Sequence, residues 1–256
     1  MRIEDVDRAR EVPGAAADIL RTLEAFGLTW DGPVLHQSTR STAYAEALER
    51  LTALGLTYPC SCSRAELGAE GLEGRYPGTC RAGPRRQGVP LAIRFRTQGF
   101  APVRFEDRLQ GPCSEDVCAV VGDFVLRRRD GFWAYQLAVV VDDAFQRITD
   151  VVRGLDLLDN TARQRLLQAA LGLPMPRMLH LPLLVEQDGG KLSKSRRALP
   201  VDPAAAPAAL SEVLRLLRHA PPAGLQHAPV GEQLAWAVQA WNPMLLQEVK
   251  TIIASP

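Results

Sequence analysis

Three cysteines and a tyrosine stand close together between residues 60 and 80. Cys60, Cys62, Tyr76 and Cys80 belong to a segment rich in Gly, Pro and Arg, and such a composition rarely packs without a cross-link or a bound metal. Three thiolates and one further donor complete a tetrahedral zinc site. Only one residue separates Cys60 from Cys62, whereas about two to four are usual between paired zinc ligands. The pattern therefore predicts a metal site, with three unrelated core cysteines as the alternative.

A second group of reactive side chains follows a Gly-Gly pair. Lys191, Ser193, Lys194 and Ser195 come directly after Gly189–Gly190. Ammonium groups on a short loop can follow the negative charge that builds up on a phosphate during its transfer. The segment therefore predicts a phosphate-handling loop, and an ordinary solvated loop is the alternative.

Three further residues have side chains that suit binding of a small molecule with both a carboxylate and an ammonium group. Arg153 ends a predicted buried strand, where open α/β sheets place their ligands, and its guanidinium suits two-pronged binding of a carboxylate. Tyr135 lies on an otherwise apolar helix, so a core tyrosine is an equally good interpretation. Glu4 follows the opening strand and can accept hydrogen bonds from an ammonium group, although an isolated glutamate is more often a surface residue. None of the four histidines has a partner at a useful spacing, and no chemistry is assigned to them.

Helices are expected on both sides of these residues. Apolar residues at helical spacing predict helices at 13–26, 41–54, 134–144, 211–219 and 231–241. Thr161 is expected to cap a further helix over 161–172, and the Pro/Ala-rich stretch 199–209 is expected to be a linker.

Strands are expected mainly in the middle of the chain. Alternating apolar residues predict antiparallel strands at 91–96, 102–107 and 123–131. A buried strand at 148–154, followed by a helix and another strand, is typical of a parallel α/β sheet. We therefore expect the α/β class.

The composition excludes several classes of protein. The chain has 256 residues, 46% of them hydrophobic, which is enough for a substantial core. The net charge of +1 gives no bulk basic field toward nucleic acid. No apolar run approaches the roughly 20 residues that span a bilayer, and no signal peptide is present, so a cytoplasmic protein without membrane contact is expected. Five cysteines in such a chain argue against a disulfide framework.

Five segments, taken in order, resemble the catalytic region of the class I glutamyl-tRNA synthetases. They are RIEDVD, CSC followed by Y and C, AYQLAVVVDD, VVRGLDLLDNTARQ and KLSKS. The resemblance covers nearly all of residues 1–200. It implies a Rossmann-type catalytic domain with a zinc-containing insertion and a short helical C-terminal region. The implied boundaries are 1–57 and 131–200 for the two parts of the Rossmann domain, 58–130 for the insertion and 201–256 for the helical region.

Within this family the chain is most similar to the short paralogues, the glutamyl-Q tRNA(Asp) synthetases. The tail after KLSKS is too short for the large helical domain of a full glutamyl-tRNA synthetase. The resemblance implies that ATP, with Mg²⁺, and glutamate form glutamyl-adenylate. Glutamate then passes to the cyclopentene ring of queuosine in the anticodon loop of tRNA(Asp). A monomer is expected.

The resemblance also implies a role for each group of residues. The residues that match the glutamate-binding positions are Glu4, Tyr135 and Arg153. Those that match the ATP loop are Lys191, Ser193, Lys194 and Ser195. Lys194 is the residue most expected to contact the reacting phosphates, and both lysines are expected to be catalytic. Those that match the ligands of one Zn²⁺ per chain are Cys60, Cys62, Tyr76 and Cys80.

One departure from the family is visible at the start of the chain. In the family, a central first strand and a HIGH-type loop and helix precede RIED, and Met1 stands here where that strand would continue. The expected consequence is unpaired backbone in neighbouring strands and a low stability. Two other functions therefore stay open: a catalytically inactive tRNA-binding zinc module and, less favoured, a fragment of an ordinary glutamyl-tRNA synthetase.

Overall fold

The computed structural model describes residues 1–7, 9, 11–63, 66–67, 74–187, 189–190 and 201–254. The predicted phosphate-handling loop, with Lys191, Ser193, Lys194 and Ser195, lies outside the described residues.

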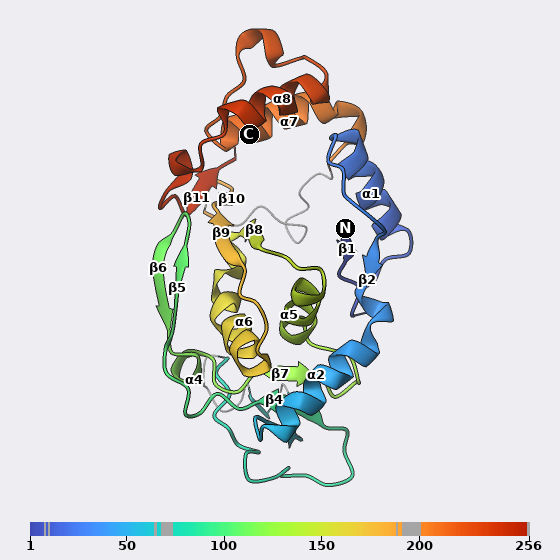
Figure 1. Ribbon diagram of the computed structural model, residues 1–256, viewed down its shortest axis with the longest axis vertical. Helices are drawn as coiled ribbons and strands as arrows, with labels where there is room; N and C mark the ends of the chain where they lie inside the picture. The colour runs from blue at the N-terminus through green and yellow to red at the C-terminus, as the bar shows by residue number, and fades with distance from the viewer. Residues whose placement is uncertain are drawn as a thin grey trace.

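Helices make up the middle and one end of the molecule (Figure 1). The α-helices are α1 (Ala15–Ala25), α2 (Ser41–Ala53), α4 (Val117–Val120), α5 (Tyr135–Phe145), α6 (Leu158–Leu171), α7 (Ala206–Leu216) and α8 (Val230–Ala240). Short 3-10 turns are η2 (Gln37–Thr39), η3 (Leu155–Leu157), η5 (Pro203–Ala205), η6 (Ala223–Leu225) and η7 (Pro243–Leu246). The main core is formed where α2, α5 and α6 pack together around buried residues such as Leu51, Leu137 and Leu167.

The described strands form four small sheets. The strands are β1 (Arg2–Ile3), β2 (Leu35–His36), β3 (Thr57–Cys60), β4 (Ala92–Phe95), β5 (Val103–Asp107), β6 (Gly111–Glu115), β7 (Val125–Arg127), β8 (Asp150–Gly154), β9 (Arg177–Leu181), β10 (Leu183–Val185) and β11 (Thr251–Ile253). The order β3-β4-β7 is antiparallel, whereas β6-β5-β9-β8 combines one antiparallel with two parallel pairs. β1 pairs with β2, and β10 with β11, both in parallel. The chain thus has an α/β fold with mixed sheets.

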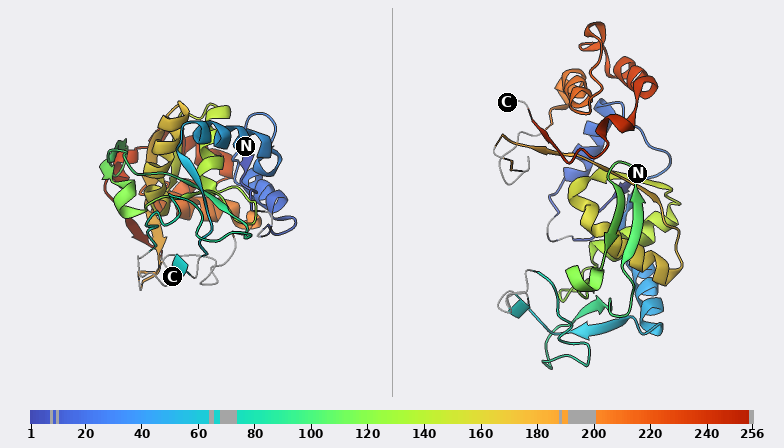
Figure 2. Two further views of the ribbon diagram at one scale, coloured as in Figure 1. Left: turned by 90° about the horizontal axis from the view of Figure 1, so that it is seen from below. Right: turned by 90° about the vertical axis from the view of Figure 1, so that its left-hand side faces the viewer.

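The sheets place the candidate residues at different ends of the molecule. β3, β4 and β7 lie at the end opposite α7 and α8, while β8 and β9 lie near the centre beside α5 and α6 (Figures 1 and 2). The parallel pair β8–β9, connected through α6, confirms the predicted strand–helix–strand unit. β11 pairs with β10 and so places residues 251–253 beside the strand that follows β9.

Two of the local predictions are wrong. Thr161 does not cap α6, which begins at Leu158 because η3 leads directly into it; Thr161 is 1% exposed inside the helix. The Pro/Ala-rich stretch is not a linker over its second half, because α7 begins at Ala206. Alanine is the best helix former, and a proline in the first turn costs no hydrogen bond. β6 and β11 were not anticipated, since neither has an alternating apolar pattern.

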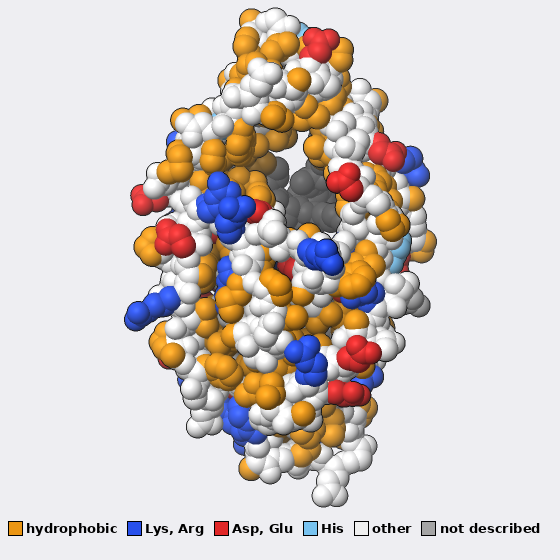
Figure 3. Space-filling view, in the orientation of Figure 1, with side chains coloured by type: hydrophobic (Ala, Val, Ile, Leu, Met, Phe, Trp, Pro, Cys, Tyr) orange, Lys and Arg blue, Asp and Glu red, His pale blue; other side chains and the backbone are white. Residues whose placement is uncertain are grey.

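Charged side chains are dispersed over the surface. On the face shown in Figure 3, basic and acidic side chains alternate among apolar ones without gathering into one patch, in keeping with the net charge of +1. None of the helices in the described part of the chain combines the length and the apolar character that crossing a membrane requires.

A buried carboxylate on α5 connects that helix to α2. Asp142 is 0% exposed and accepts hydrogen bonds from Tyr44 Oη at 2.6 Å, from Gln37 Nε2 at 2.8 Å and from Arg40 Nε. We expect Asp142→Ala to lower the free energy of unfolding by about 3 to 5 kcal/mol, because three donors lose their acceptor and a buried cation loses its partner. Urea denaturation measures the change. The control is Asp18→Ala, whose carboxylate is 69% exposed; a loss in Asp142→Ala as small as the control's, within about 0.5 kcal/mol, would contradict the expectation.

Candidate functional site

The cysteine cluster predicted from the sequence is assembled at the end of β3. Cys60 ends this strand, Cys62 follows it, and the loop that carries Tyr76 and Cys80 folds back over both. The three sulfur atoms lie within 4.8 Å of one another, and Cys60 and Cys80 are fully buried. The sequence therefore identified a cluster that exists in three dimensions, although the residues between 60 and 80 are not all described.

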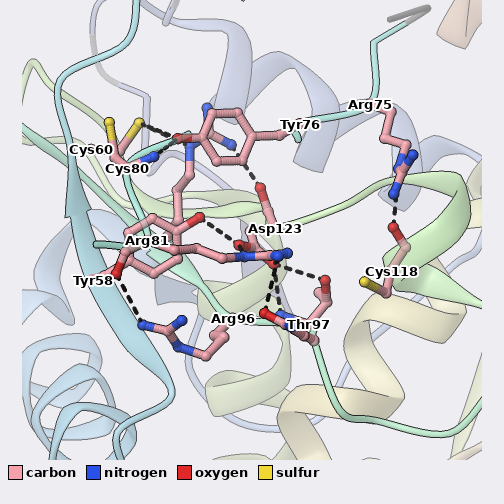
Figure 4. A network of polar contacts seen from close by, with 12 residues as sticks. Tyr58, Cys60, Arg75, Tyr76, Cys80, Arg81, Arg96, Thr97, Cys118 and Asp123 are labelled. Atoms are coloured by element: carbon pink, nitrogen blue, oxygen red, sulfur yellow. Dashed lines mark hydrogen bonds and ion pairs between the residues drawn. The ribbon is translucent and has the colours of Figure 1, made fainter. Parts of the chain in front are cut away.

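The distances within the cluster fit a tetrahedral ion. Bonds of about 2.3 Å from zinc to sulfur place two sulfur ligands about 3.8 Å apart. Cys62 Sγ lies 3.6 Å from Cys80 Sγ, and Tyr76 Oη lies 3.3 Å from Cys60 Sγ and 3.8 Å from Cys62 Sγ. Tyr76 thus has the position of a fourth donor, and Figure 4 shows its hydroxyl pointing toward Cys60 and Cys80. These four side chains are able to hold one metal ion.

The surroundings favour thiolates in this cluster. Arg94 Nε donates to Cys60 Sγ at 3.3 Å, and the guanidinium also lies 3.6 Å from the centre of the Tyr76 ring. Burial alone would raise the pKa of the Cys80 thiol, but hydrogen bonds from the backbone of Arg85 and Ser61 lower this pKa to about 6. Burial raises the pKa of Cys62 to about 11. The cluster therefore contains one thiol that ionises readily, and a divalent cation would ionise the others.

Asp123 holds the cysteine loop against the β3-β4-β7 sheet (Figure 4). Its carboxylate is 0% exposed and accepts five hydrogen bonds. The donors are Tyr58 Oη at 2.5 Å, Arg81 Nε and Nη2 at 2.6 and 2.9 Å, and the Thr97 backbone N and Oγ1, both at 2.8 Å. Arg81 follows Cys80 directly, so this ion pair fixes the position of the third thiol. The Asp123 carbonyl in turn accepts from Arg94 Nη1 at 2.7 Å.

A glycine next to Asp123 allows the tyrosine to approach. The backbone of Tyr76 bridges to Gly122, and Tyr76 N donates to Val121 O at 3.0 Å. A Cβ atom on Gly122 would lie 2.0 Å from the Tyr76 carbonyl oxygen, and φ of Gly122 is +71°, which favours glycine. The position of the Tyr76 hydroxyl thus depends on this contact.

Arg153, at the end of β8, is surrounded by neutral acceptors. Its guanidinium donates to His180 Nε2 at 3.0 Å and to Gln164 Oε1 at 3.0 Å. It also donates to Leu157 O at 3.0 Å and to Thr161 Oγ1 at 2.8 Å. Among the described residues, none of these hydrogen bonds goes to a carboxylate. The charge of Arg153 is therefore available to an anionic ligand. At least four of its five N–H groups are already used, so the two-pronged contact expected from the sequence would require one bond to be exchanged.

Glu4 and Tyr135 lie close to Arg153 but are bound differently. The pKa of Tyr135 is raised by burial and by the negative charge of Glu4, while the nearby charge of Arg153 opposes the rise. Glu4 is 41% exposed, and its Oε1 accepts from Arg2 Nη2 at 2.9 Å. Arg2 also reaches Asp143 Oδ1 at 2.7 Å. An ammonium group that binds Glu4 would therefore share this carboxylate with Arg2.

A cavity of about 950 Å³ connects the two candidate sites. Glu4 and Tyr135 line it, and so do Cys62 and Ser63 from the cysteine loop and Trp133. One of the four metal-binding candidates, Cys62, and two of the three amino-acid-binding candidates, Glu4 and Tyr135, thus line one cavity. The predicted phosphate-handling residues lie outside the described residues, so their position relative to this cavity stays a prediction.

Comparisons with known proteins assign the chain to a family. The model for the catalytic domain of the class I tRNA synthetases (E and Q) matches residues 1–206. Glutamyl-Q tRNA(Asp) synthetase from Pseudomonas aeruginosa (strain LESB58) is 51% identical over 255 residues, which are 98% of this chain and 85% of that protein. The protein of the same name from Pseudomonas putida (strain W619) is 49% identical over 98% of this chain and 84% of its own. The chain belongs to the glutamyl-Q tRNA(Asp) synthetase family.

Solved structures of longer synthetases share the fold. Glutamate-tRNA synthetase from Elizabethkingia anophelis matches with a TM-score of 0.78 at 25% identity, over 99% of this chain and 60% of that one. A glutamate tRNA ligase from Elizabethkingia meningosepticum CCUG26117, solved in complex with its amino acid, matches over the same shares with a TM-score of 0.77. The chain thus spans about three-fifths of these two proteins. The family resemblance seen in the sequence is confirmed, and with it an aminoacyl-tRNA synthetase of the ligase class.

Sequence reasoning missed a buried histidine beside Arg153. His180 and Asp107 are both 0% exposed, and His180 Nδ1 lies 2.6 Å from Asp107 Oδ2. His180 thus has a partner 73 residues away in the sequence, which the search for partners at a short spacing could not find. No local spacing reveals the contact, because the partners come from β5 and β8, on either side of β9. Arg94 and Asp123 escaped notice for the same reason.

The buried position of Asp123 predicts an acid-sensitive cysteine loop. Burial alone would raise the pKa of Asp123, but its bonds to Arg81 and Thr97 lower it to about 2. This stabilisation, about 2 kcal/mol for a shift of this size, is complete above the ordinary pKa of 3.8 and is lost as the pH falls through 2. We expect Asp123→Asn to unfold more easily at pH 7 and to lose less stability between pH 4 and pH 2 than the wild type. Denaturation at each pH, with Asp18→Asn as the exposed control, measures both effects; parallel pH curves for wild type and Asp123→Asn would contradict the assignment.

Proposed function

We propose that this chain activates glutamate with ATP and transfers it to queuosine in the anticodon loop of tRNA(Asp). The observation that carries the proposal is the partly buried guanidinium of Arg153, whose hydrogen bonds to His180, Gln164, Leu157 and Thr161 all go to neutral groups. Asp143 and Glu4 lie near enough to stabilise its charge, but neither accepts one of these hydrogen bonds, so a carboxylate of a ligand can still bind the guanidinium directly. The names of relatives at about half identity over nearly the whole chain support glutamate as that ligand and queuosine as the acceptor.

Each proposed residue has a separate part in activation. Arg153 attracts a carboxylate of glutamate, Tyr135 supplies a hydroxyl beside it, and Glu4 receives the ammonium group. A glutamate carboxylate oxygen attacks the α-phosphorus of ATP and pyrophosphate leaves. The residues proposed to stabilise the charge on the phosphates, together with Mg²⁺, are Lys191, Ser193, Lys194 and Ser195.

Transfer completes the proposed reaction. A hydroxyl on the cyclopentene ring of queuosine attacks the activated carbonyl, and AMP leaves. The cavity lined by Tyr135 and Cys62 is large enough for a nucleoside beside the amino acid. The four-part division at 57, 130 and 200 and the monomeric state stay predictions.

We also propose that Cys60, Cys62, Tyr76 and Cys80 bind one Zn²⁺. The spacing of the donors supports this proposal, and so does the charge: three thiolates and one Zn²⁺ sum to −1, which Arg94 offsets. Zinc would be structural here, because all four positions are filled by protein donors and none is left for a substrate.

The proposed activity is tested by glutamate-dependent ATP–pyrophosphate exchange without tRNA. We expect exchange by the wild-type chain and a loss of at least about 100-fold in kcat/KM in Arg153→Ala, since a charged hydrogen-bonding partner of the substrate is removed. Arg21→Ala, on the exposed face of α1, is the matched control and retains the rate. Folded protein that binds tRNA(Asp) but gives no exchange would reject the proposal in favour of an inactive tRNA-binding module. Glutamylation of tRNA(Glu) at its terminal adenosine would instead indicate ordinary charging.

The zinc proposal is tested by metal analysis of protein purified without chelator. We expect about one zinc per chain in the wild type and a strong loss in Cys60→Ser and Cys80→Ser, because both thiolates are direct ligands. Cys113→Ser, a cysteine outside the cluster, is the control and keeps its zinc. Equal zinc contents in all four proteins would exclude the assignment.

A further inference from the structure

Two buried residues, His180 and Asp107, form a chain of hydrogen bonds behind the Arg153 guanidinium. We propose that His180 and Asp107 are positioning residues, which hold the Arg153 guanidinium in place for a carboxylate of the amino acid. The inference rests on the proposed function for the identity of that amino acid. The contacts that carry it involve described residues alone.

The three side chains form a chain across adjacent strands. Asp107 ends β5, His180 is the last residue but one of β9, and Arg153 lies opposite His180 in the β8–β9 register. Asp107 Oδ2 lies 2.6 Å from His180 Nδ1, and Arg153 Nε donates to His180 Nε2 at 3.0 Å. Asp107 Oδ1 is held by the backbone N–H groups of Leu109 and Gln110, at 3.0 and 2.9 Å. The carboxylate thus has a fixed position from which to orient the ring.

The contacts define the protonation of the histidine. Arg153 Nε carries a hydrogen and cannot accept, so His180 Nε2 must be the acceptor in that contact. The proton of a neutral His180 is therefore on Nδ1, where Asp107 accepts it. A carboxylate that fixes the tautomer and direction of a histidine ring is a known arrangement in other enzymes. Here the oriented histidine ring accepts a hydrogen bond from an arginine.

The inserted imidazole also preserves the charge of the guanidinium. A carboxylate bonded directly to Arg153 would neutralise it and compete with an anionic substrate. Asp107 instead acts through a neutral ring, so Arg153 gains a fixed Nε contact and keeps its charge for the substrate. Gln164, Thr161 and the Leu157 carbonyl are the other hydrogen-bond acceptors, and all three are neutral, while the carboxylates of Asp143 and Glu4 act on Arg153 through their charge.

Protonation of His180 would break this arrangement. Burial and the nearby charge of Arg153 lower the pKa of His180 below its ordinary value of 6.5, while Asp107 opposes the shift. The charged groups that face the ring are Asp107 from β5 and Arg153 from β8, and the backbone of Leu157 lies on the η3 side. A doubly protonated ring could not accept from Arg153 and would repel it. Glutamate affinity should therefore be constant above pH 6.5, the ordinary pKa of histidine, and should weaken only as the pH falls through the lower pKa of His180.

The test compares two substitutions in the exchange assay. His180→Leu removes the acceptor, and we expect the KM for glutamate to rise about 10- to 100-fold, while the KM for ATP changes little. His180→Gln places an amide oxygen where Nε2 was, so it should restore most of the glutamate affinity and abolish its dependence on pH below 6.5. His219→Gln is the matched control, because His219 is a buried histidine outside the site and accepts from the Asn242 backbone.

A second measurement does not depend on activity. The ¹⁵N chemical shifts of the His180 ring in the folded wild-type chain should show a protonated Nδ1 and an unprotonated Nε2. A protonated Nε2, or an unchanged KM for glutamate in folded His180→Leu, would overturn the positioning role even if the wild type is active. A wild-type chain with the expected ring shifts but without glutamate-dependent exchange or glutamate binding would reject the proposed function, and with it the role toward glutamate.

Discussion

The cost of burying a guanidinium among strands decides how the centre of this molecule is built. Arg153 lies near the end of β8 and is partly buried, so its shielded N–H groups need acceptors within the protein. The chain supplies these acceptors from η3, α6 and β9, all of them neutral. Because α6 begins at Leu158, three residues before the expected cap, Thr161 lies inside the helix, where its hydroxyl accepts from Arg153.

Buried aspartates serve as the junctions between elements. Asp107 joins β5 to β9, Asp123 joins the cysteine loop to β3 and β4, and Asp142 joins α5 to α2. Each accepts at least three hydrogen bonds, which offsets the desolvation of the charge. Apolar packing alone would hold these elements together without fixing their register to within a fraction of an ångström. The charged junctions restrict the geometry of the thiols and of Arg153.

The sequence predicted those features that depend on near neighbours. The helix at 134–144, the strand that ends at Arg153 and the clustering of Cys60 with Cys80 follow from local periodicity, composition and spacing. The strands β6 and β11 were not predicted, because their residues do not alternate in polarity and because pairing with other strands stabilises them. The contacts of His180 were not predicted either, because they form only when β5, β9 and β8 lie side by side in the folded chain. The candidate binding residues were thus easier to recognise in the sequence than the buried residues that contact them.

The position of Asp107 also couples the amino-acid site to the end of the chain. Its Oδ1 accepts from Gln110 N, and the Gln110 amide donates to the carbonyls of His180 and Val249 at 3.0 and 3.3 Å. Val249 leads into β11, which pairs with β10, the strand that precedes the lysine-rich segment. Groups in one hydrogen-bond network commonly interact by about 0.5 to 3 kcal/mol. Because Gln110 contacts Asp107, His180 and Val249, we expect a displacement of β11 to alter the support of His180.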